Sequence, residues 1–92
     1  MIESFRHKGL KLFFETGKES GINRAHTKKL QLLLANLNAC VDLREMNLPG
    51  YRLHKLIGKE KEFYSLTISG NWHIIFKFDG KNVTDVDYLD YH

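Results

Sequence analysis

The spacing of apolar residues changes once along this chain, at the segment NLPG over residues 47–50. Before that segment, leucines recur at the three- and four-residue intervals of an amphipathic helix, whereas after it apolar and polar residues alternate as they do in strands. The segment contains the only proline of the 92 residues, and proline followed by glycine interrupts regular structure. Helices followed by hairpin-linked strands predict an α+β fold, with two N-terminal helices packed on one face of a small, mainly antiparallel sheet.

The first half of the chain predicts two helices. In HKGLKLFFETGK (residues 7–18), Leu10, Phe13 and Phe14 form one apolar stripe, and Gly17 is placed to end the helix. Asn23 is a suitable N-cap for a second helix. The apolar stripe of this second helix consists of Leu30, Leu33, Leu34, Leu37 and Val41. The first five residues, MIESF, predict a short strand.

The second half predicts four strands and two tight turns. The strands are YRLHKL (51–56), EFYSLTIS (62–69), WHIIFKF (72–78) and VTDVDYLDYH (83–92), with turns at GN (70–71) and DGKN (79–82). On the third strand, the core face consists of Trp72, Ile74, Phe76 and Phe78. The sheet face away from the helices is therefore expected to be partly polar and to carry His73 and Lys77, with His54 and the C-terminal residues as further candidates.

Composition narrows the class of protein. The length predicts a single domain over residues 1–92. A net charge of +3 is compatible with RNA, DNA or an acidic protein as partner and selects none of them. The single cysteine, Cys40, lies late in a helical apolar pattern, which indicates packing and favours a reducing compartment. The sequence has neither an apolar run long enough for a bilayer nor a signal-peptide hydrophobic region, so we expect a cytoplasmic protein.

The densest basic stretch is YRLHKLIGKEK, residues 51–61. A solvated loop between strands is the simpler interpretation of such a stretch. The functional interpretation is a rim that contacts RNA phosphates. The candidate RNA-binding residues are Arg52, Lys55, Lys59, Lys61 and, on the third strand, Lys77.

Acid–base chemistry points to the strands. No two of the five histidines have the spacing of a helical zinc motif, so we predict no structural metal, and we interpret His7 and His26 as surface or packing residues. The remaining candidates, all on neighbouring strand segments, are His54, His73, Asp90, Tyr91 and His92. Together these groups suffice for metal-free acid–base chemistry on a phosphodiester. The simpler alternative is that the C-terminal residues merely end the last strand.

Four segments together carry a family resemblance: MIESFRHKGLKLFFETG, YRLHKLIG, YSLTISGNWHIIFKF and the final DYH. Over essentially its whole length, the chain resembles the HigB toxins of the RelE/ParE superfamily of bacterial toxin–antitoxin systems. The resemblance implies a compact α+β fold like that of microbial ribonucleases. It further implies metal-independent and cofactor-free cleavage of messenger RNA in the ribosomal A site, and a HigA-like helix-turn-helix antitoxin that also binds its own promoter DNA.

The resemblance also implies roles for individual residues. His92 is the leading acid or base, assisted by Tyr91 and oriented by Asp90, while His54 and His73 contact phosphate. Two positions depart from the family pattern: Ile57 precedes Gly58 where relatives often have lysine, and His73 follows Trp72 where they have arginine. Which histidine donates and which accepts a proton stays open.

These two departures predict reduced activity, and they leave a second interpretation open. The chain could be a non-catalytic ParE-like protein-binding toxin that inhibits gyrase, or an inactive relic. The DYH ending favours the enzyme, because a pure protein binder has no chemical need for it. A metal-bound nuclease is weaker still, since Asp85 and Asp87 face away from Asp90 by strand alternation.

Overall fold

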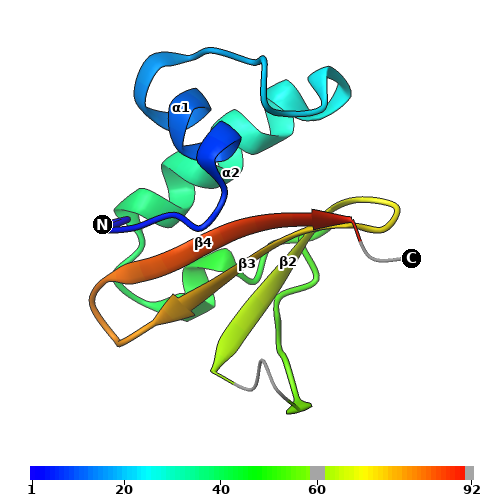
Figure 1. Cartoon of the computed structure of the whole chain (residues 1–92). Helices are drawn as coiled ribbons and strands as arrows, with labels where there is room; N and C mark the ends of the chain where they lie inside the picture. Colours follow the sequence, from blue (N-terminus) through cyan, green and yellow to red (C-terminus); the bar gives the residue numbers. More distant parts are fainter. Residues whose placement is uncertain (59–61, 91–92) are drawn as a thin grey trace.

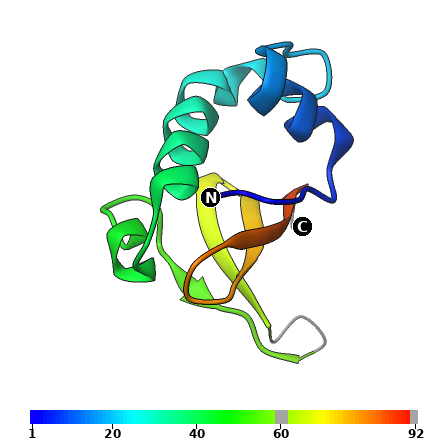
Figure 2. The ribbon, with the colours of Figure 1, turned by 90° about the vertical axis from the view of Figure 1, so that its left-hand side faces the viewer.

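A computed structural model describes residues 1–58 and 62–90 of the chain. Its elements, in chain order, are α1 Lys8–Thr16, η1 Arg24–His26, α2 Thr27–Ala39, η2 Leu43–Met46, β1 His54–Lys55, β2 Phe63–Ser69, β3 Trp72–Phe78 and β4 Val83–Asp90. The four strands form one antiparallel sheet in the order β1-β2-β3-β4. Both α-helices lie on the same side of this sheet (Figures 1 and 2), which confirms the predicted α+β fold class.

Helix α1 is capped at both ends, at Gly17 as the sequence predicts and at His7, for which the sequence predicts a surface or packing role. The His7 Nδ1 accepts a hydrogen bond from the Leu10 N–H at 3.0 Å, so this histidine serves as the N-cap. Gly17 has a left-handed φ of 81° and donates its N–H to the Phe13 carbonyl, which ends the helix. Leu10 and Phe13 are buried against the core.

Helix α2 follows a single 3-10 turn, η1, that Asn23 caps through a 3.0 Å bond from the Ala25 N–H. The four leucines of the predicted stripe, Leu30, Leu33, Leu34 and Leu37, are all buried, which confirms this part of the prediction, whereas Leu32 lies off the stripe and is exposed. Val41 was assigned to that stripe wrongly, because the helix ends at Ala39 and Val41 is 74% exposed. Cys40 instead points inward from extended backbone and is 1% exposed, as its predicted packing role requires.

The connection between the helices and the sheet differs most from the prediction. Asp42 and Glu45 form a capping box that begins the short helix η2, and Met46 of η2 is fully buried. The predicted strand over residues 51–56 is reduced to the two residues of β1. Arg52 causes this shortening, because its φ of 50° is incompatible with an extended strand.

The predicted N-terminal strand MIESF forms only two isolated parallel bridges to β4, Ile2 with Val83 and Phe5 with Val86. A bulge in β4 separates the two bridges. There Asp85 has a φ of 54° and donates its N–H to the Ser4 hydroxyl. The N-terminal segment therefore lies beside β4 without completing a regular fifth strand.

The helix-facing side of the sheet forms the core with α1 and α2. Leu66, Ile68, Ile74, Phe76 and Tyr88 are all buried there, and Trp72 packs partly buried against them, as predicted. The side away from the helices, called the open face below, is less polar than expected. Phe63, Ser65 and Ile75 lie on it and are buried nonetheless. No helix in the described part of the chain is long and apolar enough to span a bilayer.

Candidate active site on the open face of the sheet

Strand register brings two of the predicted histidines to the open face. His54 of β1 pairs with Ser65, and Ser65 pairs with Ile75, which in turn pairs with Asp87 of β4. Thr67, His73 and Leu89 form the neighbouring row. Directly opposed residues of antiparallel strands share a face. Two strand spacings and one two-residue step therefore place the Cα atoms of His54 and His73 roughly 12 Å apart.

Both imidazoles are held by the same hydrogen bond. The His54 Nδ1 lies 2.9 Å from the Arg52 carbonyl oxygen, and the His73 Nδ1 lies 2.8 Å from the Asn71 carbonyl oxygen. A carbonyl oxygen can only accept, so each Nδ1 must carry the hydrogen. In its neutral form, each ring then has its lone pair on Nε2, which is the nitrogen that can accept a proton.

The backbone before His54 is strained. Arg52 adopts a left-handed φ of 50°, which costs an L-residue about 1–2 kcal/mol. This conformation directs the Arg52 carbonyl toward the His54 ring. Strained backbone of this kind concentrates at functional sites, where it fixes a group in position.

Two of the predicted basic residues, Lys55 and Lys77, lie together at one end of the sheet. Lys55 pairs with Tyr64, its Nζ lies 6.0 Å from the Tyr64 ring centroid, and it faces away from the side that carries His54. Lys77 makes ion pairs with Glu62 at 3.5 Å and with Asp85 at 3.7 Å. Both lysines line an open cavity of about 370 Å³. Arg52 contacts His54 through its main-chain carbonyl.

The C-terminal part of the site is described only up to Asp90. Asp90 pairs with Trp72, so register places it on the helix-facing side of β4, whereas His73 lies on the open face. Tyr91 and His92, together with Lys59 and Lys61, lie outside the described residues. Ile57, which stands at one of the divergent positions, is 91% exposed.

Arg6 is a cation on this face that the sequence did not predict. Its guanidinium carbon lies 4.5 Å above the ring centroid of Phe63 on β2. The main chain of Arg6 donates to the Val86 carbonyl of β4, whereas Phe63 belongs to β2, so this contact links segments on opposite sides of β3. Only this long-range contact, which leaves no local pattern in the sequence, identifies Arg6.

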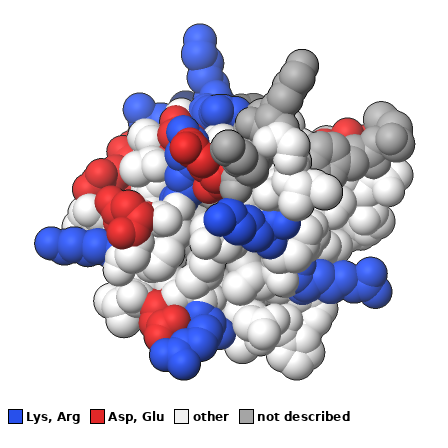
Figure 3. Space-filling model, turned by 90° about the horizontal axis from the view of Figure 1, so that it is seen from below, with Lys and Arg blue, Asp and Glu red and all other residues white. Residues whose placement is uncertain are grey.

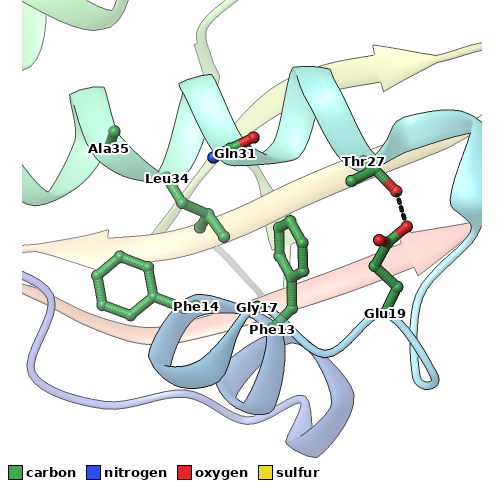
Figure 4. Close-up of a pocket in the computed structure, with 8 residues that line it drawn as sticks. All are labelled: Phe13, Phe14, Gly17, Glu19, Thr27, Gln31, Leu34 and Ala35. Carbon is green, nitrogen blue, oxygen red and sulfur yellow. Dashed lines mark hydrogen bonds between the residues drawn. The ribbon is translucent and has the colours of Figure 1, made fainter.

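A second cavity lies elsewhere, between α1 and α2 (Figure 4). It has a volume of about 380 Å³, and its apolar lining comes from Phe13, Phe14, Leu34 and Ala35. Its single carboxylate, on Glu19, accepts a 2.8 Å hydrogen bond from the Thr27 hydroxyl. The cavity belongs to the helical layer, whereas the histidine pair lies on the opposite side of the sheet. Within residues 1–58 and 62–90, no three His, Cys, Asp or Glu side chains gather closely enough to bind a metal ion.

Comparisons with known proteins identify the family. Residues 3–92 match the family described as the RelE-like toxin of the type II toxin–antitoxin system HigB. The chain is 37% identical to Endoribonuclease HigB of Proteus vulgaris over 92 residues, covering all of both proteins.

Solved structures show the same fold. A variant of YafQ from E. coli has a TM-score of 0.61 at 22% identity, covering 98% of this chain and 91% of that one. HP0894 from Helicobacter pylori has a TM-score of 0.51 at 18% identity, covering 96% and 94%. The resemblance carried by the sequence motifs is thus confirmed, and this chain belongs to the HigB-like family of RelE-like toxins of type II toxin–antitoxin systems.

Proposed function

We propose that this chain is the endoribonuclease toxin of its system and cleaves messenger RNA in the A site of the 70S ribosome. The supporting observation is the pair of imidazoles on the open face, each with its hydrogen held on Nδ1 by a main-chain carbonyl, which leaves Nε2 as the nitrogen that can accept a proton. Family membership and the similarity to Endoribonuclease HigB support the same activity.

The proposed reaction needs no metal and no cofactor. A base takes the proton from the 2′-hydroxyl of the RNA, the resulting oxygen attacks the adjacent phosphorus, and an acid protonates the leaving 5′-oxygen. His92 acts as the acid or the base, with help from Tyr91 and orientation by Asp90. His54 and His73 contact the phosphate through Nε2, where a protonated ring donates to a phosphoryl oxygen.

The cationic part of the site is weaker than in a site built from arginine and lysine. Lys77 is engaged by two carboxylates, and Lys55 faces away from His54. Arg52 and Arg6 are therefore the described cations that we propose to approach RNA, while Lys59 and Lys61 remain proposals from sequence. With histidine at position 73 and isoleucine at position 57, we propose reduced activity, and the ribosome supplies much of the positioning.

The same proposal covers the partner of the protein and its location in the cell. The partner is a HigA-like helix-turn-helix antitoxin, which also carries any contact with promoter DNA. The toxin acts in the cytoplasm as a single domain over residues 1–92.

A defined messenger RNA on purified 70S ribosomes tests the proposal. Cuts should fall in the A-site codon and leave a 2′,3′-cyclic phosphate and a 5′-hydroxyl, because the 2′-oxygen is the nucleophile. A message with a 2′-deoxy residue at the cut site is the substrate control and should remain intact. Deleting His92 should slow cleavage about 10²–10⁴-fold, as expected for a general acid or base, with little change in melting temperature.

Three results would count against this assignment. Cleavage of the 2′-deoxy message or products with 3′-hydroxyl ends would indicate hydrolysis by another mechanism. Full activity after deletion of His92 would remove that residue from the site. An intact message together with gyrase inhibition would instead support the non-catalytic ParE-like toxin.

A further inference from the structure

A buried aromatic cluster joins the helical layer to the end of β4. Its members are His26 at the junction of η1 and α2, Tyr88 on β4 and Trp72 on β3. The Nδ1 of His26 is hydrogen-bonded to the Tyr88 hydroxyl, a contact between residues 62 positions apart in the chain. His26 is 6% exposed and Tyr88 4% exposed, so this polar contact is shielded from solvent.

Ring packing fixes the cluster from several sides. The Trp72 and Tyr88 ring centroids lie 4.6 Å apart, and the edge of His26 meets the Trp72 ring at 5.4 Å. His7, the N-cap of α1, contacts Tyr88 edge-on at 5.4 Å. Four elements of the fold thus meet at one tyrosine, which lies two residues before Asp90.

The protonation states of His26 and Tyr88 decide which of the two groups donates this hydrogen bond. Burial, and to a lesser degree the charge of Lys29, lower the pKa of His26, so its ring is neutral near pH 7. Burial raises the pKa of Tyr88, so its hydroxyl keeps its proton. A neutral Nδ1 can then accept from the hydroxyl, and the pair is satisfied without a buried charge.

The position of this cluster gives it a role beyond packing. Tyr88 pairs with Ile74 and Asp90 pairs with Trp72, so the cluster includes the strand partner of Asp90 and a residue two positions before it. We propose that His26 is a positioning residue, which acts through Tyr88 to hold Asp90 in place for RNA cleavage. This inference rests on the proposed function of the C-terminal residues, and it adds a positioning role to the packing role predicted for His26.

Single-turnover cleavage on 70S ribosomes tests the role. Tyr88→Phe removes only the hydroxyl, and His26→Phe keeps a ring but removes Nδ1. Each variant should slow the cleavage step about 10- to 100-fold, the loss expected when a reacting group is misplaced by about 1 Å, with unchanged ribosome binding. The double variant should be no slower than the slower single one, because both remove the same bond. His26→Gln, which can still accept from Tyr88, should recover most of the rate.

Leu37→Ala provides the matched control for stability. Leu37 is fully buried on α2, outside the His26–Tyr88–Trp72 cluster, so its truncation destabilises the fold without touching the cluster. At a temperature where all variants are folded, Leu37→Ala should cleave like the wild-type chain. Equal rates for Tyr88→Phe, His26→Phe and Leu37→Ala would overturn the inference, as would additive effects in the double variant.

A separate readout distinguishes this inference from the proposed function. If the wild-type chain cleaves no message at all, the proposed function has failed. The backbone amide signal of Asp90 in nuclear magnetic resonance then decides the positioning role alone. A displaced Asp90 signal in Tyr88→Phe, with the signals of α2 unchanged, supports it, and an unchanged Asp90 signal overturns it.

Discussion

At the scale of single residues, His54 and His73 share one hydrogen-bond arrangement and differ in exposure. His54 is exposed, whereas His73 is half-buried beside Thr67 and Leu89. A carbonyl acceptor two residues earlier holds each ring, so the outward nitrogen is the same in both. This common orientation could not be predicted from sequence, because it depends on turns that aim the Arg52 and Asn71 carbonyls.

Replacing His73→Arg should raise cleavage and toxicity. Arginine carries a permanent charge and a planar fork that suits phosphate, whereas a histidine must first be protonated. Rates for both proteins at pH 7.5, corrected for the folded fraction, provide the measurement. If His73→Arg is no faster than the wild-type chain at pH 7.5, position 73 has no phosphate-contacting role.

Replacing Arg6→Gln should slow cleavage about 10-fold or more, because it removes a charge-assisted contact to phosphate from the open face. The dependence of RNA binding on salt should also weaken, by about 0.7 in the slope of log affinity against log salt for one lost phosphate contact to a single strand. Arg6→Lys retains the charge and should keep the slope. Arg24→Gln, on exposed η1, is the matched control. An unchanged slope in Arg6→Gln would place Arg6 outside the RNA contact and leave it only a structural role over Phe63.

At the scale of elements, sequence patterns predicted the helices and turns whose structure depends on residues close together in the chain. The α1 stripe, its end at Gly17 and the α2 leucines follow from spacing and caps. The hairpin at residues 79–82 follows from Asp79, whose carboxylate accepts from two following main-chain N–H groups. What could not be predicted rests on contacts between distant residues. The N-terminal segment beside β4, the Arg6–Phe63 contact and the His26–Tyr88 bond are examples.

The loop that follows α1 passes close to this helix, and two glycines make this close approach possible. A Cβ added to Gly9 would lie 2.6 Å from the Gly21 carbonyl oxygen, and one added to Gly21 would lie 2.5 Å from the Gly9 Cα. The requirement here is space, since neither glycine has a left-handed φ. Gly9→Ala should therefore destabilise the protein by about 1–3 kcal/mol, as overpacking does, although the same change stabilises an exposed helix by about 1 kcal/mol.

Urea unfolding of Gly9→Ala, with Lys11→Ala at an exposed position of α1 as control, gives the free energies to compare. The control should lie within about 0.5 kcal/mol of the wild-type chain. A stabilised Gly9→Ala would mean that the loop can move aside at little cost, and that the two backbones need not touch.

The cavity between α1 and α2 is the apolar feature best suited to the antitoxin that the family implies. Its lining includes the exposed residue Ala35, where a charge can be added without disturbing the core. Ala35→Glu should weaken antitoxin binding at least about 10-fold, because it places a carboxylate in an apolar contact. Cleavage should be unchanged, since the cavity lies across the sheet from the histidines. Ala39→Glu, the same change at an exposed position of α2 that does not line the cavity, is the control.

Isothermal titration with the purified antitoxin measures both variants. If Ala35→Glu and Ala39→Glu bind equally well, the antitoxin covers another surface. Loss of cleavage in Ala35→Glu would instead show that the change had disturbed the fold.

At the scale of the whole molecule, the described part of the open face carries charges of both signs. Seen from the side away from the helices, Lys and Arg side chains lie near Asp and Glu side chains over part of this face (Figure 3). The Lys77 ion pairs with Glu62 and Asp85 are one case of this mixing. A surface of mixed sign attracts free RNA only weakly. This distribution supports the proposal that the toxin depends on the ribosome to present the message. The net charge of +3 does not reveal how the charges are distributed.

Buried and capping groups make the stability of the whole fold depend on pH in two separate ranges. Burial lowers the pKa of His26 from 6.5, so the unfolded chain binds this proton more readily than the folded one. The free energy of unfolding should therefore be highest above pH 6.5 and fall as the pH drops below it. Hydrogen bonds from Arg44 lower the pKa of Asp42 from 3.8 to about 2, and main-chain N–H groups lower that of Asp79. The contribution of Asp42 should disappear as the pH falls from 3.8 toward 2, and that of Asp79 as the pH falls below 3.8.

His26→Gln isolates the first of these ranges, because it keeps an acceptor for Tyr88 and removes the titrating group. Urea unfolding of both proteins between pH 7.5 and 5 should give a smaller loss of stability for His26→Gln than for the wild-type chain. All other titratable groups are the same in both proteins, so the difference between the two profiles reports His26 alone. If the free energy of unfolding changes with pH in the same way in both proteins, His26 is protonated as easily in the folded chain as in the unfolded chain. In that case the neutral hydrogen bond to Tyr88, on which the anchoring of β4 depends, would not be the form that the folded protein uses.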